Sequence, residues 1–237
     1  MKNTIIVLLL MTYSAAVFGQ PKEHREVRQL QPFDKIKISK GINVTLREGD
    51  NPEAEIIIAN ANLDDVLISQ ENKEVFIRMK TKVYKNVMVN VYVTFQELKE
   101  IQAGTGGSLD SEDIIEAEEL TLTAGMDASI DLEVEVGKLI VSASVARIQV
   151  SGTADKIDVN ISSGGKYFGY KLECQDAKIR AVSGALAQVW VTENLDAYAA
   201  TGAIVEYIGA PLRVDSNVLL GGKVLEVGEG DEEDEEF

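Results

Sequence analysis

Residues 139–162 read LIVSASVARIQVSGTADKIDVNIS, and this stretch decides the fold. Every second position of 139–143 and of 157–161 is apolar, and each run ends in a corner of small residues. The unit recurs between about 101 and 222, with corners spaced 17 to 21 residues apart. That period is too long for a simple hairpin and too short for a strand–helix–strand unit. The corners are 103–107, 124–128, 143–146, 161–165, 181–185, 199–203 and 216–222.

The apolar positions keep one phase through the repeats. Side chains alternate between the two faces of a strand, so matched triplets pile into one interior column when the units stack. A single unit cannot bury its apolar face, whereas stacked neighbours can. We therefore predict an all-β, right-handed parallel β-helix-like solenoid, with an antiparallel β-sandwich as the alternative. The expected triplets are Leu120, Leu122, Ala124; Leu139, Val141, Ala143; Ile157, Val159, Ile161; Ala177, Ile179, Ala181; Leu195, Ala197, Ala199; and Leu212, Val214, Ser216.

The residues between these apolar positions should form two outward rows. In one row the charge alternates in sign from Asp158 to Arg213, which would set opposite charges side by side on neighbouring rungs. Each exposed pair contributes only about 0.2–1 kcal/mol, so its main effect is on register. The expected rows are Thr121, Ile140, Asp158, Lys178, Asp196, Arg213 and Thr123, Ser142, Asn160, Arg180, Tyr198, Asp215.

Residues 33–97 show strand patterns outside the repeat. Alternation of apolar and polar residues marks strands at 33–39 and 42–47, and residues 70–74 separate two apolar runs as in a hairpin. The sequence predicts one domain at 33–227, in which an N-terminal β segment (33–97) precedes the repeats (98–227).

The two ends of the chain differ in composition from this domain. Residues 1–19 combine Lys2, an apolar run and small residues before Gln20, which is typical of a signal peptide. The run is too short to span a bilayer, so no membrane span is expected. Residues 20–32 are interpreted as a linker, and 228–237, with seven acids, as an acidic disordered tail. The protein is expected to be exported: periplasmic, on the cell surface or secreted.

The composition excludes several classes of function. The chain carries 23 Lys and Arg against 39 Asp and Glu, a net charge of −16, with no basic patch for nucleic acid. Cys174 is the only cysteine, so no intramolecular disulfide can form, and it is expected to be a buried apolar residue. His24 is the only histidine and lies just after the leader. This excludes histidine-dependent catalytic triads within the domain and multi-histidine zinc sites. The sequence predicts no metal and no cofactor.

The opening of the domain carries a family resemblance. Residues 33–46 read FDKIKISKGINVTL, and Gly41-Ile42-Asn43 matches the motif that names the head GIN domain family. The resemblance extends through Ala103-Gly104-Thr105-Gly106 and the glycine-serine repeats, from about Phe33 to Val227. The family was once a domain of unknown function and is labelled an auto-transporter adhesin head. It is similar in outline to β-helical proteins, which implies a β-solenoid, and it supplies no catalytic residues.

Two kinds of function remain open. One is non-catalytic binding, with an adhesin-like or cell-envelope scaffold role; candidate ligand contacts are Asn160, Arg180, Tyr198 and Trp190, and the partner would be a glycan or an envelope protein. The other is a carbohydrate-active enzyme, a polysaccharide lyase or hydrolase, which needs clustered acids beside a Lys or Arg. We favour the first and predict that the protein is not an enzyme. Self-assembly through the solenoid ends, giving a homo-oligomer, is a third expectation. The residues considered for catalysis are Asp127, Asp131, Asp158, Lys178 and Arg180.

Overall fold

The computed structural model describes residues 23–228, which form seventeen strands and one short 3-10 turn. The prediction of a β-solenoid is confirmed: about seven turns follow a curled N-terminal sheet. The expected leader (1–19) and all but Gly228 of the expected tail lie outside the described residues. Within the described part of the chain, no helix is long and apolar enough to cross a membrane.

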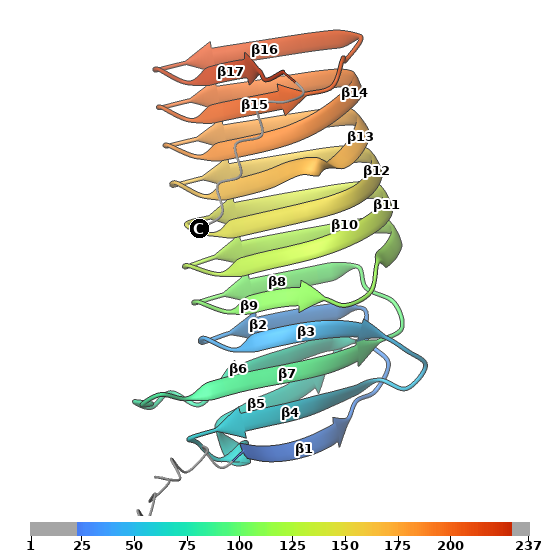
Figure 1. The fold of residues 1–237 in the computed structure, drawn as a ribbon, viewed down its shortest axis with the longest axis vertical. Coiled ribbons are helices and arrows are strands. Elements are labelled where there is room, and N and C mark those ends of the chain that lie inside the picture. Colours follow the sequence, from blue (N-terminus) through green and yellow to red (C-terminus); the bar gives the residue numbers. More distant parts are fainter. Residues whose placement is uncertain (1–22, 229–237) are drawn as a thin grey trace, which may run out of the picture.

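Each turn of the solenoid runs along two faces that lie back to back (Figure 1). Face A contains β1, β4, β7, β3 and β9, the first halves of β11 to β14, then β15 and β17; face B contains β5, β6, β2 and β8, the end of β10, the second halves of β11 to β14, then β16. All pairs between successive turns are parallel, which excludes the antiparallel sandwich. The elements are β1 (Glu23–Gln29), β2 (Lys35–Ser39), β3 (Asn43–Glu48), β4 (Glu53–Ala59), η1 (Leu63–Asp65), β5 (Val66–Glu71), β6 (Glu74–Met79), β7 (Met88–Phe95), β8 (Glu100–Gly104), β9 (Ser108–Ser111), β10 (Ile115–Gly125), β11 (Ser129–Ser144), β12 (Arg147–Ser162), β13 (Lys166–Val182), β14 (Leu186–Ala200), β15 (Ile204–Ile208), β16 (Arg213–Leu219) and β17 (Lys223–Glu226).

From β8 to β17, tight corners join the end of each face B strand to the next face A strand, along the left edge in Figure 1. Ser163 and Gly164 both have positive φ, 53° and 72°, and Gly165 N–H donates to Ser162 O at 2.9 Å. Two central residues with positive φ define the turn that best matches strand twist. Gly164 N–H donates to Ser183 O of the next corner at 3.0 Å, so the corners are also bonded to one another.

The interior column predicted from the sequence is present. Val141 pairs with Val159, and Val159 with Ile179, so the three side chains follow one another across the rungs. Each is at most 1% exposed. Burial of such columns along the whole length supplies the hydrophobic stabilisation that an isolated rung lacks.

The last rung departs from the expected register. Leu195 pairs with Val214 and Asp196 with Asp215, so Leu212 is not an interior residue and is 87% exposed. The prediction that Arg213 lies beside Asp196 is therefore wrong, as is the placement of Asp215 beside Tyr198, whose neighbour is Asn217. Two carboxylates, Asp196 and Asp215, stand on neighbouring rungs instead.

The N-terminal end is closed by antiparallel strands that the repeat does not contain. On face A, β4 pairs with β7 and β1 pairs with β4; on face B, β5 pairs with β6. Residues 23–29, which the sequence assigned to a linker, form strand β1. From β1, Arg28 reaches across to face B, where its guanidinium donates to Val66 O at 2.8 Å and Leu63 O at 3.2 Å.

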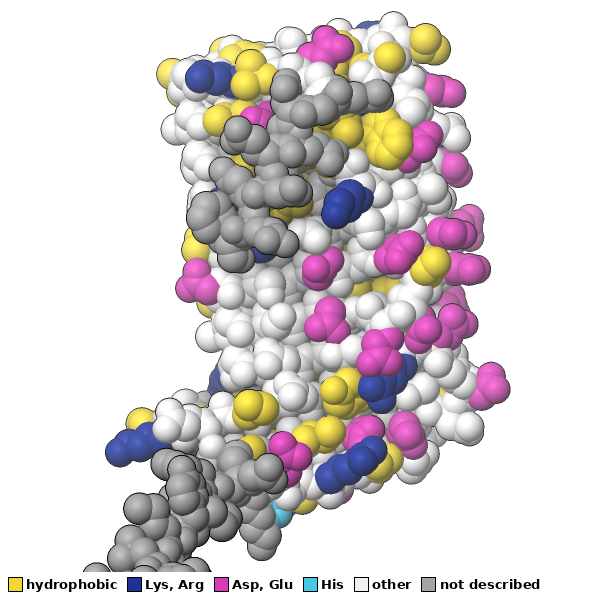
Figure 2. Space-filling view, viewed as in Figure 1, with side chains coloured by type: hydrophobic (Ala, Val, Ile, Leu, Met, Phe, Trp, Pro, Cys, Tyr) yellow, Lys and Arg dark blue, Asp and Glu magenta, His cyan; other side chains and the backbone are white. Residues whose placement is uncertain are grey.

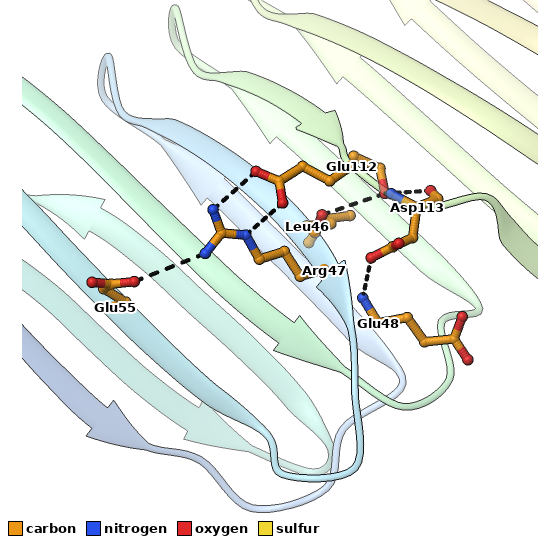
Figure 3. A network of polar contacts seen from close by, with 7 residues as sticks. Leu46, Arg47, Glu48, Glu55, Glu112 and Asp113 are labelled. Carbon is orange, nitrogen blue, oxygen red and sulfur yellow. Dashed lines mark hydrogen bonds and ion pairs between the residues drawn. The ribbon is translucent and has the colours of Figure 1, made fainter.

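A polar cluster joins this end to the first repeats (Figure 3). Arg47 of β3 makes two hydrogen bonds to the Glu112 carboxylate, at 2.8 and 2.9 Å, and lies 3.9 Å from the Tyr92 ring centroid. The Asp113 carboxylate accepts Glu48 N–H at 2.8 Å. The Glu112 carboxylate raises the pKa of the Arg47 guanidinium, with further support from Glu55. The segment after β9 is thereby fixed against β3, where the curled sheet meets the solenoid.

Candidate binding surfaces

A shallow groove of about 420 Å³ crosses the outer surface of face B. Two rows of stacked outward side chains on β11 to β14 and β16 line it, and we call it the face B groove. Because parallel strands place equivalent residues side by side, each row runs along the solenoid axis. One row is Lys138, Lys156, Asp176, Asn194 and Arg213; the other contains Asp158, Lys178, Asp196 and Asp215.

Charge in this groove is balanced, unlike that of the whole chain. The lining contains four basic and four acidic side chains, whereas the chain carries a net charge of −16. Lys156 Nζ lies 3.7 Å from an Asp176 carboxylate oxygen, and Asn194 Nδ2 donates to Asp176 at 2.7 Å. These groups are largely solvated, so they add little to stability and can exchange partners with a ligand. The groove therefore suits a polar ligand of low net charge.

Three of the four candidate ligand residues form a strip beside this groove. Asn160 pairs with Arg180 and Arg180 with Tyr198, all pointing outward on face B. The Arg180 guanidinium stacks 4.4 Å from the centroid of the Tyr198 ring, which holds both planes in place. The structure thus brings these three together, as the sequence predicted for neighbouring rungs.

Trp190 lies apart from this strip. It belongs to the face A half of β14, where it pairs with Ile208, whereas Tyr198 belongs to the face B half. Its half-buried ring covers the backbone of Gly209, so closely that a Cβ there would meet Trp190 Cδ1 at 2.9 Å. The side chain is therefore held by packing and does not extend the face B strip.

The residues considered for catalysis are also divided between the two faces. Asp158, Lys178 and Arg180 point outward on face B, whereas Asp131 is on face A and Asp127 is in a corner. Partial desolvation raises the pKa of Asp131 although the residue is exposed, Arg147 lowers it, and Asp110 on the neighbouring rung raises it. Gln149 donates to Asp131 at 3.4 Å. Sequence reasoning did not pair Asp131 with Asp110, because the two are 21 residues apart and meet only through the stacking.

Face A also carries an aromatic group that the sequence analysis missed. The Arg147 guanidinium stacks 4.1 Å from the Phe168 centroid, and Tyr170 Oη donates to Glu206 at 3.2 Å. Gln188 donates to the same Glu206 oxygen at 2.9 Å. The register of β13 shifts in this region, between Gly169 and Glu173, which marks a β-bulge. Three aromatic residues within 167–170 are the signal that could have found this group.

The single cysteine and histidine occupy very different places. Cys174 is buried as expected, its thiol donates to Trp190 O at 3.2 Å, and burial raises its pKa to about 12. The thiol is therefore unreactive at neutral pH. His24 lies on β1 at a hollow lined also by Lys82, Tyr84 and Lys85. Among residues 23–228, no group of three or more His, Cys, Asp or Glu side chains is placed to hold a metal ion.

Acidic side chains gather on the edge opposite the tight corners, where the long strands bend from face A to face B (Figure 2). Repulsion along this edge disfavours contact with acidic surfaces. The exposed acids of this edge include Glu116, Glu118, Glu133, Glu135, Asp155, Glu173 and Glu193.

Solved structures of several bacterial proteins share this fold. One from Bacteroides fragilis, described as a "putative adhesin", superposes with a TM-score of 0.77 at 15% identity, covering 87% of this chain and 97% of that one. One from Parabacteroides merdae with the same description gives 0.72 at 21% identity, covering 87% and 96%. A "putative lipid binding protein" of Parabacteroides distasonis gives 0.65 at 16% identity, covering 86% and 96%.

The sequence comparison agrees with the structural one. No curated protein matches the chain. The family model described as "Putative auto-transporter adhesin, head GIN domain" matches residues 32–211, which is most of the chain and nearly all of the solenoid. The chain therefore belongs to the head GIN domain family.

Proposed function

We propose that the protein is an exported, non-catalytic β-solenoid that binds a glycan or an envelope protein through the face B groove and the adjacent strip of Asn160, Arg180 and Tyr198. The observation that carries this proposal is the balanced groove itself, with four basic and four acidic side chains along stacked rungs of an acidic chain. A hydroxyl-rich or mixed-charge ligand can satisfy both signs at once, and Tyr198 adds a ring for stacking.

Export and adhesion are supported by the leader and by the family. Residues 1–19 have the charge, apolar run and small-residue end of a signal peptide. The family model and two of the related structures carry an adhesin description. A lipid, as the name of the third relative suggests for that protein, fits less well here. The interior is filled by buried side chains, and the groove is lined mostly by charged groups.

A binding experiment tests the proposal directly. The purified protein would be applied to a glycan array and to solubilised envelope proteins, and each ligand found would be titrated against variants. Lys178→Ala, in the groove, should weaken binding by roughly tenfold, the loss of about 1.4 kcal/mol. Lys166→Ala is a matched control, because Lys166 is also exposed on β13 but on face A. Equal effects of the two substitutions, or none from either, would overturn the assignment to face B.

The second candidate function, a carbohydrate-active enzyme, rests on Asp131. The pKa of Asp131 is raised and Asp110 lies beside it, as in glycosidases, where one of two paired carboxyl groups has a raised pKa and acts as the acid. Lyase and hydrolase assays on acidic and neutral polysaccharides would decide it. Turnover that Asp131→Ala abolishes and Lys178→Ala leaves intact would establish chemistry on face A, and turnover lost in Lys178→Ala would place it on face B. Either result would replace the non-catalytic proposal.

A further inference from the structure

A loop at the N-terminal end of the solenoid differs in charge from the rest of the chain. It joins β6 to β7, and we call residues 80–87 the basic loop. Residues 75–96 contain four bases and no acid, in a chain with 39 acids and 23 bases. Residues 1–22, which precede β1, also contain no acid, so the segment that leads into this end adds no negative charge. The four bases are Arg78, Lys80, Lys82 and Lys85.

The basic loop projects from the edge that carries the tight corners (Figure 1). Figure 2 shows basic and apolar side chains together at this projection. Asn60 Nδ2 donates to Asn86 O at 2.7 Å, and this bond holds the end of the loop. Tyr84 Oη donates to Lys80 O at 3.1 Å and closes the loop on itself. Val83 lies within this bonded loop and is 90% exposed, so the loop presents an apolar side chain to solvent.

An open hollow of about 710 Å³ lies beside Val83. Its lining includes Lys82, Lys85, His24 and two asparagine amides, and none of the described lining residues is acidic. The Asp65 carboxylate neutralises Lys82 at 2.6 Å, whereas Lys85 has no ion pair within residues 23–228. The hollow therefore suits an anionic group such as a phosphate, which would pair with Lys85.

The edge formed by the tight corners, the tight-corner edge, continues this surface along the solenoid. Met126 and Val145 lie in two successive corners and are 67% and 47% exposed. Val145 has a φ of 50°, which is strained for a β-branched residue. Strain that keeps an apolar side chain in solvent is typical of a contact surface.

Charge is distributed unequally between the two edges of the solenoid. Exposed acids gather where the long strands bend, on the bend edge opposite the tight corners (Figure 2). In the corners between β8 and β17, Asp127 is the single charged residue. Of the described strands that follow these corners, none begins with an acid, and three begin with Arg147, Lys166 and Lys223. This asymmetry turns the tight-corner edge toward an anionic surface and the bend edge away from it.

We propose that the basic loop and the tight-corner edge form a contact surface for an anionic lipid bilayer. Val83 enters the boundary between headgroups and acyl chains, and lipid phosphates occupy the hollow beside Lys85. The lysines are attracted to the surface only within a Debye length, so the contact is reversible and depends on salt. An acidic protein would pair with the lysines, but a bilayer also takes up the apolar side chains of Val83, Met126 and Val145. The lipids remain in the bilayer, and none enters the interior of the solenoid.

This inference concerns attachment to a membrane surface and goes beyond the ligand binding proposed for face B. Vesicle flotation tests it on the chain from Gln20 onward, which contains every described strand. The protein should bind mixed phosphatidylcholine and phosphatidylglycerol vesicles roughly tenfold more tightly than phosphatidylcholine alone. The difference should disappear at about 1 M salt, where the Debye length is about 3 Å.

Two substitutions in the basic loop probe the two parts of the contact. Val83→Asp should weaken binding to the anionic vesicles by roughly tenfold, because it removes the apolar anchor and adds a negative charge. Lys85→Ala should weaken it about fivefold, because one lysine near the surface is lost. Both side chains are exposed, so neither substitution should disturb the fold.

Ile114→Asp and Lys171→Ala are the matched controls. Ile114 is 39% exposed in the segment before β10, and Lys171 is exposed on β13 toward the bend edge. Both should leave vesicle binding unchanged, and circular dichroism should show the same β-sheet spectrum for all variants. Equal binding to the two kinds of vesicle overturns the proposal, as does binding that survives Val83→Asp and Lys85→Ala. A dimer without lipid that Val83→Asp dissociates would make a second copy the partner and likewise overturn it.

Discussion

The apolar interior column is buried at the N-terminal end of the solenoid and partly exposed in the last described rung at the C-terminal end. At the N-terminal end, β1, β4 and β5 are antiparallel strands that no repeat contains, and Arg28 links β1 to the start of β5. Val75 and Ile77 of β6 are consequently no more than 1% exposed. In the last rung of residues 23–228, Val214 and Val218 of β16 stay partly exposed.

This difference shows that the exposed fraction of a side chain in a stacked fold depends on the neighbouring rungs as well as on the residue type. Val159 and Val218 are the same amino acid in the same strand type, yet one is fully buried and the other is 44% exposed. Each rung gains stability from the rungs on both sides, so the last rung has about half of the interface. Substitutions of one kind should therefore cost much more in the body or at the closed end than in the final rung.

The largest expected difference in the free energy of unfolding is between substitutions at two glycines that lie against the preceding rung. A Cβ at Gly152, where φ is +107°, would be 2.1 Å from Val134 O; a Cβ at Gly222 would be 2.3 Å from Ala199 O. Gly152→Ala should cost more than about 4 kcal/mol, because β12 is held between two strands and cannot move away. Gly222→Ala should cost only about 1 kcal/mol, because the end rung can shift outward.

Denaturant unfolding followed by circular dichroism would measure both free energies. Hydrogen exchange at 213–226 would show whether the loss in Gly222→Ala is local to the last rung. Similar losses of stability in the two variants would contradict the idea that the C-terminal rung is loosely held.

The next largest difference in the free energy of unfolding is expected between substitutions at two leucines. Leu46 on β3 is fully buried near the closed end, and Leu219 on β16 is 49% exposed. Leu46→Ala should destabilise the protein by about 2–5 kcal/mol, because it leaves a cavity in a packed interior. Leu219→Ala should change the free energy of unfolding by no more than about 1 kcal/mol. Thermal melts of the two variants at a concentration where the protein is monomeric would test the contrast, and a Leu219→Ala variant as unstable as Leu46→Ala would refute it.

A third, smaller contrast involves two tyrosines and predicts effects of opposite sign. Tyr167 in the body is fully buried, and its hydroxyl has no hydrogen-bond partner within residues 23–228. Tyr207 on β15 donates to Glu226 of β17 at 3.4 Å. Tyr167→Phe should stabilise the protein by about 1 kcal/mol, because an unsatisfied buried hydroxyl is removed. Tyr207→Phe should loosen β17 at a cost of about 0.5 kcal/mol. Unfolding midpoints that shift in the same direction for both would contradict this assignment.

The sequence predicts the body of the fold well because the interior positions alternate through every rung. It places the last rung incorrectly for a specific reason: a shift of two residues preserves the alternation, so Leu212 and Val214 satisfy the pattern equally well as its first interior residue. Strand β1 was missed because Val27 is its only apolar residue; backbone pairing with β4 and the contacts of Arg28 hold it in place.

The candidate site is predicted only in part. Neighbouring rungs bring Asn160, Arg180 and Tyr198 together, and the repeat spacing alone shows this. The separation of Trp190 could not be foreseen, because the bend of β14 falls at Val191-Thr192-Glu193-Asn194, where no glycine or proline marks the change of face. Similarly, the bulge in β13 that presents Tyr170 depends on how β13 packs between two strands, which is a tertiary effect.

The last contrast between the ends is their response to acid. At the closed end the Asp65 carboxylate accepts from Lys82 Nζ at 2.6 Å and from Asn62 N–H at 3.1 Å, and these bonds, with Lys82 first, lower the pKa of Asp65. A lowered carboxyl pKa adds stability above the ordinary value near 3.8, and that stability disappears as the pH falls through the folded value. Because Lys82 is 46% exposed, water screens the pair and the effect is the smallest of the four.

Asp65→Asn should therefore lower the unfolding midpoint at pH 7 and flatten its decline between about pH 5 and pH 2. Asp215→Asn is the matched control at the open end, where Arg213 and Asp215 are 73% and 67% exposed and 3.3 Å apart. That substitution should leave the acid limb of the stability curve unchanged, because solvent competes for both groups. Melts from pH 2 to pH 7 would compare the three proteins. An Asp215→Asn curve as flat as that of Asp65→Asn would mean that the acid response is spread over the surface and is not a property of the closed end.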